Sequence, residues 1–247
     1  MTVPSNQSRA AVVTGGSRGI GRAVALRLAV DGQDVVVGYV DNETEAKSTV
    51  EAIETTGGRA VAVQVDVADE NGVRALFDAA ERSFGGVDVV VNAAGVMILK
   101  PVVQLDLDEF DRMHRTNLRG TFVVAREAIG RLRAGGAIIN FSTSVTRLNL
   151  PSYAAYAASK AAVEALSPIL AKEARGRDIT VNAVAPGPTA TALFLEGKSD
   201  DLIQHIAKQN PMERLGRPDD IAEVVSLLAG NGRWINGQTI FVNGGAA

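Results

Sequence analysis

The chain has 247 residues, which suits one α/β domain and is short for two, and its 46% hydrophobic and 21% charged residues are typical of a soluble globular protein. A formal net charge of −3 gives no electrostatic reason to expect nucleic acid or an anionic membrane as a partner. Cysteine is absent and only two histidines occur, so disulfides and thiolate catalysis are excluded and we expect no metal site.

The first residues, MTVPSNQSRA, lack the basic and apolar regions of a signal peptide, and no apolar run reaches the roughly 20 residues that a membrane helix needs. We therefore expect a cytoplasmic protein. Residues 1–8 are expected to form a flexible tail, and residues 9–247 are expected to form one domain.

Short apolar runs alternate with longer helical patterns along the chain. The runs are rich in Val and Ile and mostly apolar throughout, which is typical of strands buried on both faces of a parallel sheet. The predicted strands are 10–15, 34–38, 60–66, 87–92, 137–142, 179–185 and 238–243, and the predicted helices are 19–31, 43–56, 69–84, 107–132, 152–175 and 218–229. This alternation predicts the α/β class, with a doubly wound, mainly parallel sheet of seven strands and helices on both faces.

The stretch TGGSRGIG at 14–21 follows the first strand and opens the first helix. Its glycines allow a tight turn and a close approach of the backbone to a pyrophosphate, and the helix N-terminus offers unpaired N–H groups. A glycine-rich turn alone is often structural, but its place between strand and helix favours dinucleotide binding. The candidate cofactor-binding residues here are Gly15, Ser17, Arg18, Gly19, Ile20 and Gly21.

The end of the second strand bears on the choice between NAD and NADP. An acidic residue there would hydrogen-bond the ribose 2′-OH of NAD and repel a 2′-phosphate. Tyr39 stands where that acid is expected, and the nearest carboxylate, Asp41, follows two residues later. Arg18 is either a solvated loop charge or a partner for the phosphate. We predict NADP(H) rather than NAD(H), with Tyr39 among the binding residues.

The third and fourth strands end in two further candidate cofactor contacts. Asp66 is placed to accept a hydrogen bond from the adenine amino group, with Val67 beside it, or to cap the next helix instead. The small residues of NAAG would let the adenine ribose lie against the backbone, although a plain turn is the alternative. These candidates are Asn92, Ala93, Ala94 and Gly95.

The helix expected at 152–175 contains two of the three tyrosines. Tyr156 and Lys160 are four residues apart and share one face, whereas Tyr153 has no basic residue at that offset. A nearby ammonium group stabilises a phenolate and lowers its pKa from about 10 toward the range useful for acid–base catalysis. A chance pair of this kind is common, but together with the glycine loop it predicts acid–base chemistry beside a nicotinamide.

These motifs resemble those of the short-chain dehydrogenase/reductase family, one-domain type, over nearly the whole chain. The matches are TGxxxGxG at 14–21, NAAG at 92–95, Asn117 in DRMHRTNLRGTF, a hydroxyl cluster after the fifth strand, YxxxK at 156–160 and PGPTAT at 186–191. Within the family the chain looks most like 3-oxoacyl-carrier-protein reductases and trihydroxynaphthalene reductases. The resemblance implies a Rossmann-like domain and an NADP(H)-dependent enzyme that interconverts a ketone and a secondary alcohol.

The resemblance also implies roles for particular residues. Tyr156 would give a proton to the carbonyl oxygen as hydride arrives. Lys160 would lower the pKa of that tyrosine and hold the nicotinamide ribose, and Asn117 would order a water relay to the lysine. The implied contacts on the nicotinamide side are Pro186, Gly187 and Thr189, with Thr191 as a weaker candidate.

The active hydroxyl after the fifth strand is left open between two residues. The family usually has a serine thirteen residues before the tyrosine, and this count reaches Thr143. Ser144 is one residue closer, and we prefer it because a primary hydroxyl is less hindered than that of a β-branched threonine. For the hydroxyls of this cluster that are not active, Ser142 among them, turn hydrogen bonding is the plain interpretation.

The remaining expectations concern substrate and assembly. Residues 186–217 are expected to form a substrate loop or lid, and the substrate is a small carbonyl compound or alcohol, such as a 3-oxoacyl thioester or a polyketide-like ketone. Arg126, Arg131 and Arg133 would lie on one helix and offer a basic patch to a carrier protein, although a solvated face is favoured. The resemblance implies a homotetramer, or a homodimer. His114 and His205 are expected to pack or meet solvent.

Three other functions stay open at this point. A cofactor-binding sensor on the same scaffold would not need the complete set of Tyr156, Lys160 and Asn117. An NAD-dependent alcohol dehydrogenase is disfavoured by Tyr39. A purely structural protein would leave the glycine loop and the lysine without a purpose.

Overall fold

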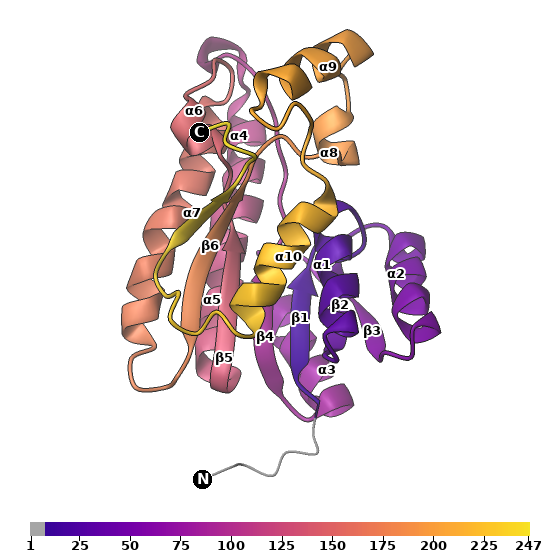
Figure 1. Ribbon diagram of the computed structural model, residues 1–247. Coiled ribbons are helices and arrows are strands. Elements are labelled where there is room, and N and C mark those ends of the chain that lie inside the picture. The colour runs from indigo at the N-terminus through magenta and orange to yellow at the C-terminus, as the bar shows by residue number, and fades with distance from the viewer. Residues whose placement is uncertain (1–7) are drawn as a thin grey trace.

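The computed structural model describes residues 8–247, which form one parallel sheet with helices on both faces (Figure 1). The strands are β1 (Ala10–Thr14), β2 (Asp34–Tyr39), β3 (Ala60–Gln64), β4 (Val87–Asn92), β5 (Leu132–Phe141), β6 (Thr180–Pro186) and β7 (Thr239–Val242). They lie in the order β3-β2-β1-β4-β5-β6-β7, and every pair is parallel. The tail predicted for residues 1–8 lies outside the described residues except for Ser8, whose hydroxyl donates to Asp34.

Long helices cross between the strands. They are α1 (Gly19–Val30), α2 (Glu43–Thr55), α3 (Glu70–Phe84), α5 (Thr121–Arg131), α7 (Ala154–Glu173) and α10 (Pro218–Ala229). Shorter helices are α4 (Leu107–His114), α6 (Val145–Leu148), α8 (Ala192–Leu195), α9 (Asp200–Gln209) and a 3₁₀ turn, Val102–Gln104. The seven predicted strands and six predicted long helices are therefore all present. The helix predicted at 107–132 is interrupted.

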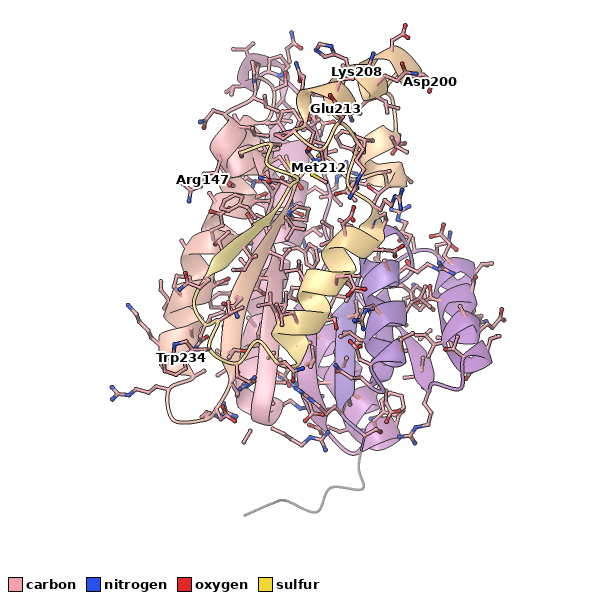
Figure 2. The ribbon with its side chains drawn as sticks, in the orientation of Figure 1. Arg147, Asp200, Lys208, Met212, Glu213 and Trp234 are labelled. Carbon is pink, nitrogen blue, oxygen red and sulfur yellow. The ribbon has the colours of Figure 1, made fainter. Side chains whose placement is uncertain are left out.

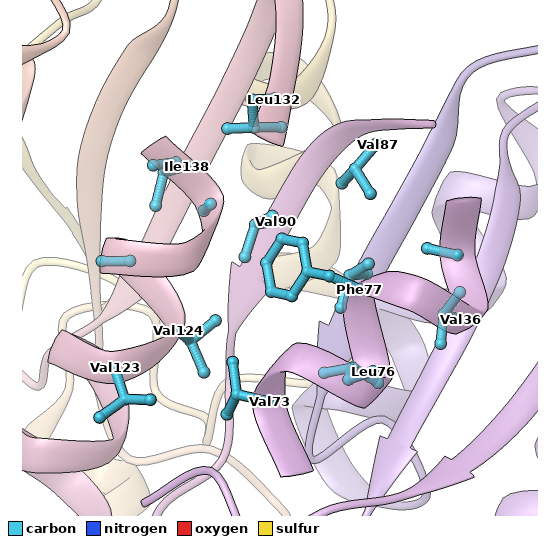
Figure 3. Packing of buried hydrophobic residues seen from close by; sticks show 14 of the residues in the cluster. Val36, Val73, Leu76, Phe77, Val87, Val90, Val123, Val124, Leu132 and Ile138 are labelled. Atoms are coloured by element: carbon cyan, nitrogen blue, oxygen red, sulfur yellow. The ribbon is translucent and has the colours of Figure 1, made fainter. Parts of the chain in front are cut away.

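Two hydrophobic clusters fill the space above and below the sheet. Because side chains alternate along a strand, Val12 of β1 enters one cluster and Val13 enters the other. The first cluster joins the sheet to α3, α5 and α7, and Figure 3 shows Phe77 and Leu76 of α3 packed among the valines of the strands. The second cluster joins the sheet to α1, α2 and α10. The strands are apolar throughout because both faces are covered.

The helix predicted at 107–132 is not uniform. Its middle, Arg115–Gly120, has π-helical hydrogen bonding between α4 and α5, which widens the helix by one residue. Such local widening occurs often at functional sites, and Asn117 lies within it. The prediction that Arg133 shares this helix is wrong, because β5 begins at Leu132 and includes Arg133.

The segment predicted as an irregular substrate loop, 186–217, contains α8 and α9. Figure 1 shows both beyond the end of the sheet where α6 and the C-terminus also lie. Among residues 8–247, no helix combines the length and apolar content needed to cross a bilayer.

Candidate active site

The candidate site lies at the carboxyl ends of the strands. β1 is hydrogen-bonded to both β2 and β4, so the chain turns toward opposite edges of the sheet after these strands. In an open parallel sheet, the crevice at such a reversal is where ligands bind. The glycine loop follows β1, NAAG follows β4, and the hydroxyl cluster follows β5, so three of the predicted motifs meet at one edge.

The glycine loop packs backbone against backbone. A Cβ atom on Gly15 would lie 2.9 Å from the Cα of Ala94, and Gly15 has φ +66. A Cβ atom on Gly21 would overlap the carbonyl oxygen of Gly15 and lie 2.8 Å from its carbon. A real Cβ atom does not come this close to backbone atoms. Positions 15 and 21 therefore need glycine because the backbone segments lie against each other there.

The start of α1 fits a negatively charged group. Arg18 is the N-cap residue and supplies no side-chain acceptor, and the first turn contains no acidic residue. The first N–H groups of the helix therefore have no partner from a cap, while the helix dipole favours an anion there. The arrangement fits the diphosphate of a dinucleotide.

The residues predicted to distinguish NADP from NAD lie beside this loop. Arg18 is exposed and forms no ion pair within residues 8–247. Tyr39 ends β2, and Asp41 is exposed two residues further on. No carboxylate therefore occupies the last position of β2, and an unpaired guanidinium is close in sequence to the diphosphate site.

Asp66 accepts two hydrogen bonds within the protein. Ala68 N–H donates to Oδ1 over 2.9 Å, and Arg115 donates to Oδ2 over 2.5 Å. Partial burial alone would raise the pKa of Asp66, but these two donors lower it below its usual value. The alternative of a helix cap is wrong, because the N-cap of α3 is Asp69. Val67 is buried against Gly120 of the π-helical turn.

The side chain of Asn92 points into the sheet rather than into the crevice. Its Nδ2 donates to Oδ1 of Asn140 on β5 over 2.8 Å, and Asn140 donates to Ser167 Oγ of α7 over 3.0 Å. This buried chain ties β4, β5 and α7 together. Of the NAAG residues, Asn92 thus offers only its backbone to a cofactor, whereas Ala94 lies against Gly15.

Tyr156 and Thr143 come together across the site. The Thr143 hydroxyl is a hydrogen-bond partner of the Tyr156 side chain. Burial raises the pKa of Tyr156 to about 12, and the hydrogen bond with Thr143 opposes this rise. The expected lowering by Lys160 is not among the causes of the shift, so the phenol keeps its proton throughout the neutral range.

The hydroxyl of Ser144 points elsewhere. Its Oγ donates to the carbonyl oxygen of Ala185 on β6 over 3.2 Å, and the residue is buried. The structure therefore brings Thr143, and not the preferred Ser144, to the tyrosine. The spacing of thirteen residues had pointed to Thr143, whereas the argument from steric hindrance had pointed to Ser144.

Lys160 lies one turn after Tyr156 on α7 and is buried, with 4% of its surface exposed. Its Nζ donates to the carbonyl oxygen of Phe141 over 2.9 Å, and a Cβ atom on Gly95 would lie 3.4 Å from it. Burial lowers the pKa of Lys160 to about 8. The amine has donors left for a ligand in the space beside Gly95.

Asn117 uses its whole side chain to join three segments. Nδ2 donates to Val96 O over 2.9 Å and to Ser159 Oγ over 3.1 Å, and Oδ1 accepts from Val96 N–H over 2.9 Å. Its backbone carbonyl accepts from the Thr121 hydroxyl over 2.8 Å. The amide thus holds the turn after β4 against α7, which carries Tyr156.

The start of the predicted substrate loop touches the glycine loop. A Cβ atom on Gly19 would lie 3.4 Å from Cγ2 of Thr191. Thr189 is buried, and its hydroxyl donates to the Gly187 carbonyl over 2.9 Å. Thr191, the weaker sequence candidate, is therefore the threonine beside the diphosphate site. Pro186 ends β6 and Gly187 packs against Asn243.

The predicted substrate loop is fastened at both ends. Thr189 pairs with Gly216 in a parallel bridge, and Asn210 Nδ2 donates to the carbonyl oxygen of Asn243 over 2.7 Å. Figure 2 labels four residues of this segment, which lie together at one end of the molecule: Asp200, Lys208, Met212 and Glu213. Trp234 lies toward the opposite end. Only α8, α9 and their connections lie between the fastenings.

The remaining candidates lie outside this site. The ring of His114 stacks on Phe110 with centroids 3.9 Å apart, and His205 is exposed and contacts Gln209. Arg126 pairs with Glu70, Arg131 with three carboxylates, and Arg133 with Asp88. The basic patch suggested for a carrier protein is thus neutralised by its own neighbours. Within residues 8–247, no cluster of three metal-ligating side chains occurs.

Comparison with known proteins finds full-length relatives. A family model described as enoyl-(acyl carrier protein) reductase matches residues 15–247. The chain is 45% identical to a short-chain type dehydrogenase/reductase of Picea abies, over 96% of this chain and 92% of the relative. It is 44% identical to NADPH-dependent aldehyde reductase 2, chloroplastic, of Arabidopsis thaliana (96% and 93%) and 40% identical to a versicolorin reductase of Emericella nidulans (96% and 95%).

Solved structures agree with the fold. A short-chain dehydrogenase from Burkholderia cenocepacia, determined in complex with NADP, superposes with a TM-score of 0.91 at 38% identity. The match covers 97% of this chain and 98% of that protein. The similarity therefore extends over the glycine loop, the hydroxyl cluster and the helix that carries Tyr156.

Proposed function

Because the chain belongs to the short-chain dehydrogenase/reductase family, we propose that it is an NADP(H)-dependent oxidoreductase that interconverts a carbonyl and an alcohol. The observation that carries the proposal is the meeting of Tyr156, Lys160 and Thr143 at the crevice where the glycine loop lies. The NADPH-dependent relatives and the NADP complex support the choice of cofactor.

The chain's own residues supply the proton and its control. When bound, the nicotinamide supplies the hydride, and the protein positions the substrate carbonyl against it. Tyr156, protonated at neutral pH because burial raises its pKa to about 12, donates to the carbonyl oxygen. Thr143 donates a second hydrogen bond to the same oxygen and stabilises the charge that develops there. Lys160 holds the ribose and returns a proton to the tyrosine.

Carbonyl reduction needs Tyr156 in its protonated form. A phenol that keeps its proton is ready to act as an acid toward a ketone or aldehyde, whereas alcohol oxidation needs the phenolate. The part of Asn117 in a proton relay to Lys160 stays a proposal that the family resemblance implies, while its side chain holds Val96 and Ser159. Thr189 and Thr191 are proposed to contact the cofactor on the nicotinamide and phosphate sides.

The proposed substrate is a small, free carbonyl compound. Relatives named as an aldehyde reductase and a versicolorin reductase support an aldehyde or an aromatic polyketide ketone. The paired arginines at 126, 131 and 133 give no support to a carrier protein. Residues 186–217 would close over this substrate, and residues 9–247 would act as one domain.

A homotetramer or homodimer is part of the same proposal. A groove of about 530 Å³ lies on the outer side of α4, the π-helical turn and α5, where Phe122 is 52% exposed. A second copy would cover this apolar surface. The cytoplasmic location stays a prediction, since the Arabidopsis relative is named as chloroplastic.

Cofactor binding and turnover together test the proposed function. NADPH is expected to bind at least about tenfold more tightly than NADH in a fluorescence titration, because Arg18 can pair with the 2′-phosphate and Tyr39 replaces a repelling acid. Loss of NADPH absorbance is then followed with an aldehyde, an aromatic quinone and a 3-oxoacyl thioester. Tight NADPH binding without turnover of any of them would favour a sensor, and preference for NADH would contradict the cofactor assignment.

The active hydroxyl has a direct test. Thr143→Ala is expected to lower kcat about 100-fold, because it removes a hydrogen bond to the charge that develops on the carbonyl oxygen. Ser144→Ala, the matched control, removes a bond to Ala185 and is expected to change kcat less than about threefold. Steady-state kinetics with saturating NADPH measure both. The reverse order of effects would restore Ser144 as the active residue.

A further inference from the structure

Glu164 lies one helical turn beyond Lys160 on α7, and the reaction proposed above gives it no role. Tyr156, Lys160 and Glu164 follow one another at intervals of four residues, so they lie along one face of the helix. That face meets the segment after β5, residues 142–146, which contains Thr143. The carboxylate is therefore placed where the helix and this segment touch.

Two hydroxyl groups of the segment donate to the same carboxylate oxygen. Ser142 Oγ lies 2.6 Å from Oε1 of Glu164, and Thr146 Oγ1 lies 2.8 Å from it. Each hydroxyl also has a longer contact with a backbone carbonyl, at 3.3 Å from Ser142 to Lys160 and 2.9 Å from Thr146 to Thr143. Since a hydroxyl has one proton, the shorter bonds to a charged acceptor are the ones it makes.

These bonds are the ones that Glu164 has in place of an ion pair. No lysine or arginine pairs with it within residues 8–247, and its side chain is only half-exposed. A half-buried carboxylate without a cation needs hydroxyl or N–H donors. If residues 142–146 moved away from α7, the Glu164 carboxylate would lose both of its donors. The contact thus stabilises one position of the segment relative to α7.

Thr143 stands between the two tethered residues. Ser142 precedes it directly and Thr146 follows three residues later, and the hydroxyls of both donate to Glu164 Oε1. We propose that Glu164 is a positioning residue for the carbonyl reaction: it fixes residues 142–146 against α7 and so holds the Thr143 hydroxyl at the hydroxyl of Tyr156. This inference rests on the proposed function, because it assigns Glu164 to the same site.

The direct test compares two substitutions of the glutamate. Glu164→Ala is expected to lower kcat about tenfold and to change the KM for NADPH less than about twofold, because small misplacements of a catalytic group slow the reaction strongly while cofactor contacts remain. Glu164→Gln is expected to keep most of the activity, since its amide oxygen still accepts both hydroxyl bonds. Glu173→Ala, an exposed glutamate at the end of the same helix, is the matched control and is expected to behave as wild type.

A double-mutant cycle separates positioning from general destabilisation. If Glu164 acts through Thr143, Glu164→Ala should lower kcat less than about twofold further in a Thr143→Ala background. An equal loss in both backgrounds, or a Glu164→Gln variant as slow as Glu164→Ala, would overturn the proposal. Thermal melts accompany each variant.

If Glu164→Ala does not fold, Thr146→Val takes its place in the cycle. It removes one of the two bonds and is expected to lower kcat about threefold in the wild-type background only. A wild-type enzyme without reductase turnover would overturn the proposed function and this inference together. Turnover that is unchanged in all three Glu164 and Thr146 variants would overturn the inference alone.

Discussion

Replacing Tyr156 by phenylalanine is expected to lower kcat for carbonyl reduction by about 10³-fold while NADPH affinity stays within about twofold. The substitution removes only the phenolic hydroxyl, and proton transfer by a positioned side chain contributes on the order of 10²–10⁴-fold to a rate. The ring keeps its packing on α7, and Lys160 keeps its bond to Phe141. The measurement is steady-state loss of NADPH absorbance, with cofactor binding followed separately by fluorescence.

Tyr153→Phe is the matched control for this substitution. Tyr153 lies three residues earlier, as the N-cap residue of α7, and burial also raises its pKa. It has no lysine at the helical offset that joins Tyr156 to Lys160, so a change of less than about fivefold is expected. Comparable losses in the two variants would mean that the pocket, rather than proton transfer from Tyr156, limits the rate.

Gly21→Ala is expected to weaken NADPH binding at least about 100-fold and to destabilise the protein by about 3 kcal/mol. The new methyl group would overlap the carbonyl oxygen of Gly15, and the atoms that must move are backbone atoms. A Cβ atom on Gly15 would itself lie 2.9 Å from Ala94, so Gly15 has little room to move toward the end of β4. The diphosphate loop would therefore open away from α1. Fluorescence titration and chemical denaturation measure the two effects.

Gly130→Ala provides the control for the glycine argument. Gly130 lies in α5, is exposed, and a Cβ atom there would meet nothing within 4 Å. Alanine is the better helix former by about 1 kcal/mol, so this variant is expected to be slightly more stable and fully active. Similar losses from Gly130→Ala and Gly21→Ala would show that helix packing in general, and not the crowded loop, is responsible.

The parts of the molecule that the sequence predicted well are those governed by short-range patterns. Valine-rich runs mark buried parallel strands because both faces need apolar side chains, and the strand positions differ from the structure by a few residues at most, except that β5 starts at Leu132 rather than 137. The glycine spacing and the four-residue interval between Tyr156 and Lys160 depend only on local geometry. These features therefore located the crevice at the carboxyl end of β1 and the helix that carries Tyr156.

Other features depend on partners far along the chain. Nothing near Asn92 shows that its amide turns toward Asn140, 48 residues later, and so belongs to the core. The direction of the Ser144 hydroxyl is decided by Ala185 on the neighbouring strand. The expected lowering of the Tyr156 pKa was wrong because burial outweighs other effects there, and burial is not a property of the helix alone.

The short helices α8 and α9 were missed for different reasons. Helix α8 has only four residues, too few to show a helical period. Helix α9 did carry a signal, since Ser199 caps it and Asp200 and Asp201 lie in its first turn. The π-helical turn around Asn117 was also unpredictable, since it depends on the bonds that Asn117 makes to Val96 and Ser159. Sequence patterns describe regular helices and carry no mark of one widened turn.

The two fastenings of the substrate segment bear on how such enzymes diversify. The Thr189–Gly216 bridge and the Asn210–Asn243 bond close the segment at its base and near its end, so the helices between them contribute little to the sheet beneath. Changes of length or composition there leave the strands, the glycine loop and Tyr156 in place. Since we propose that this segment closes over the substrate, we expect sequence changes within it to alter which carbonyl compound binds, while the residues proposed for the chemistry stay the same.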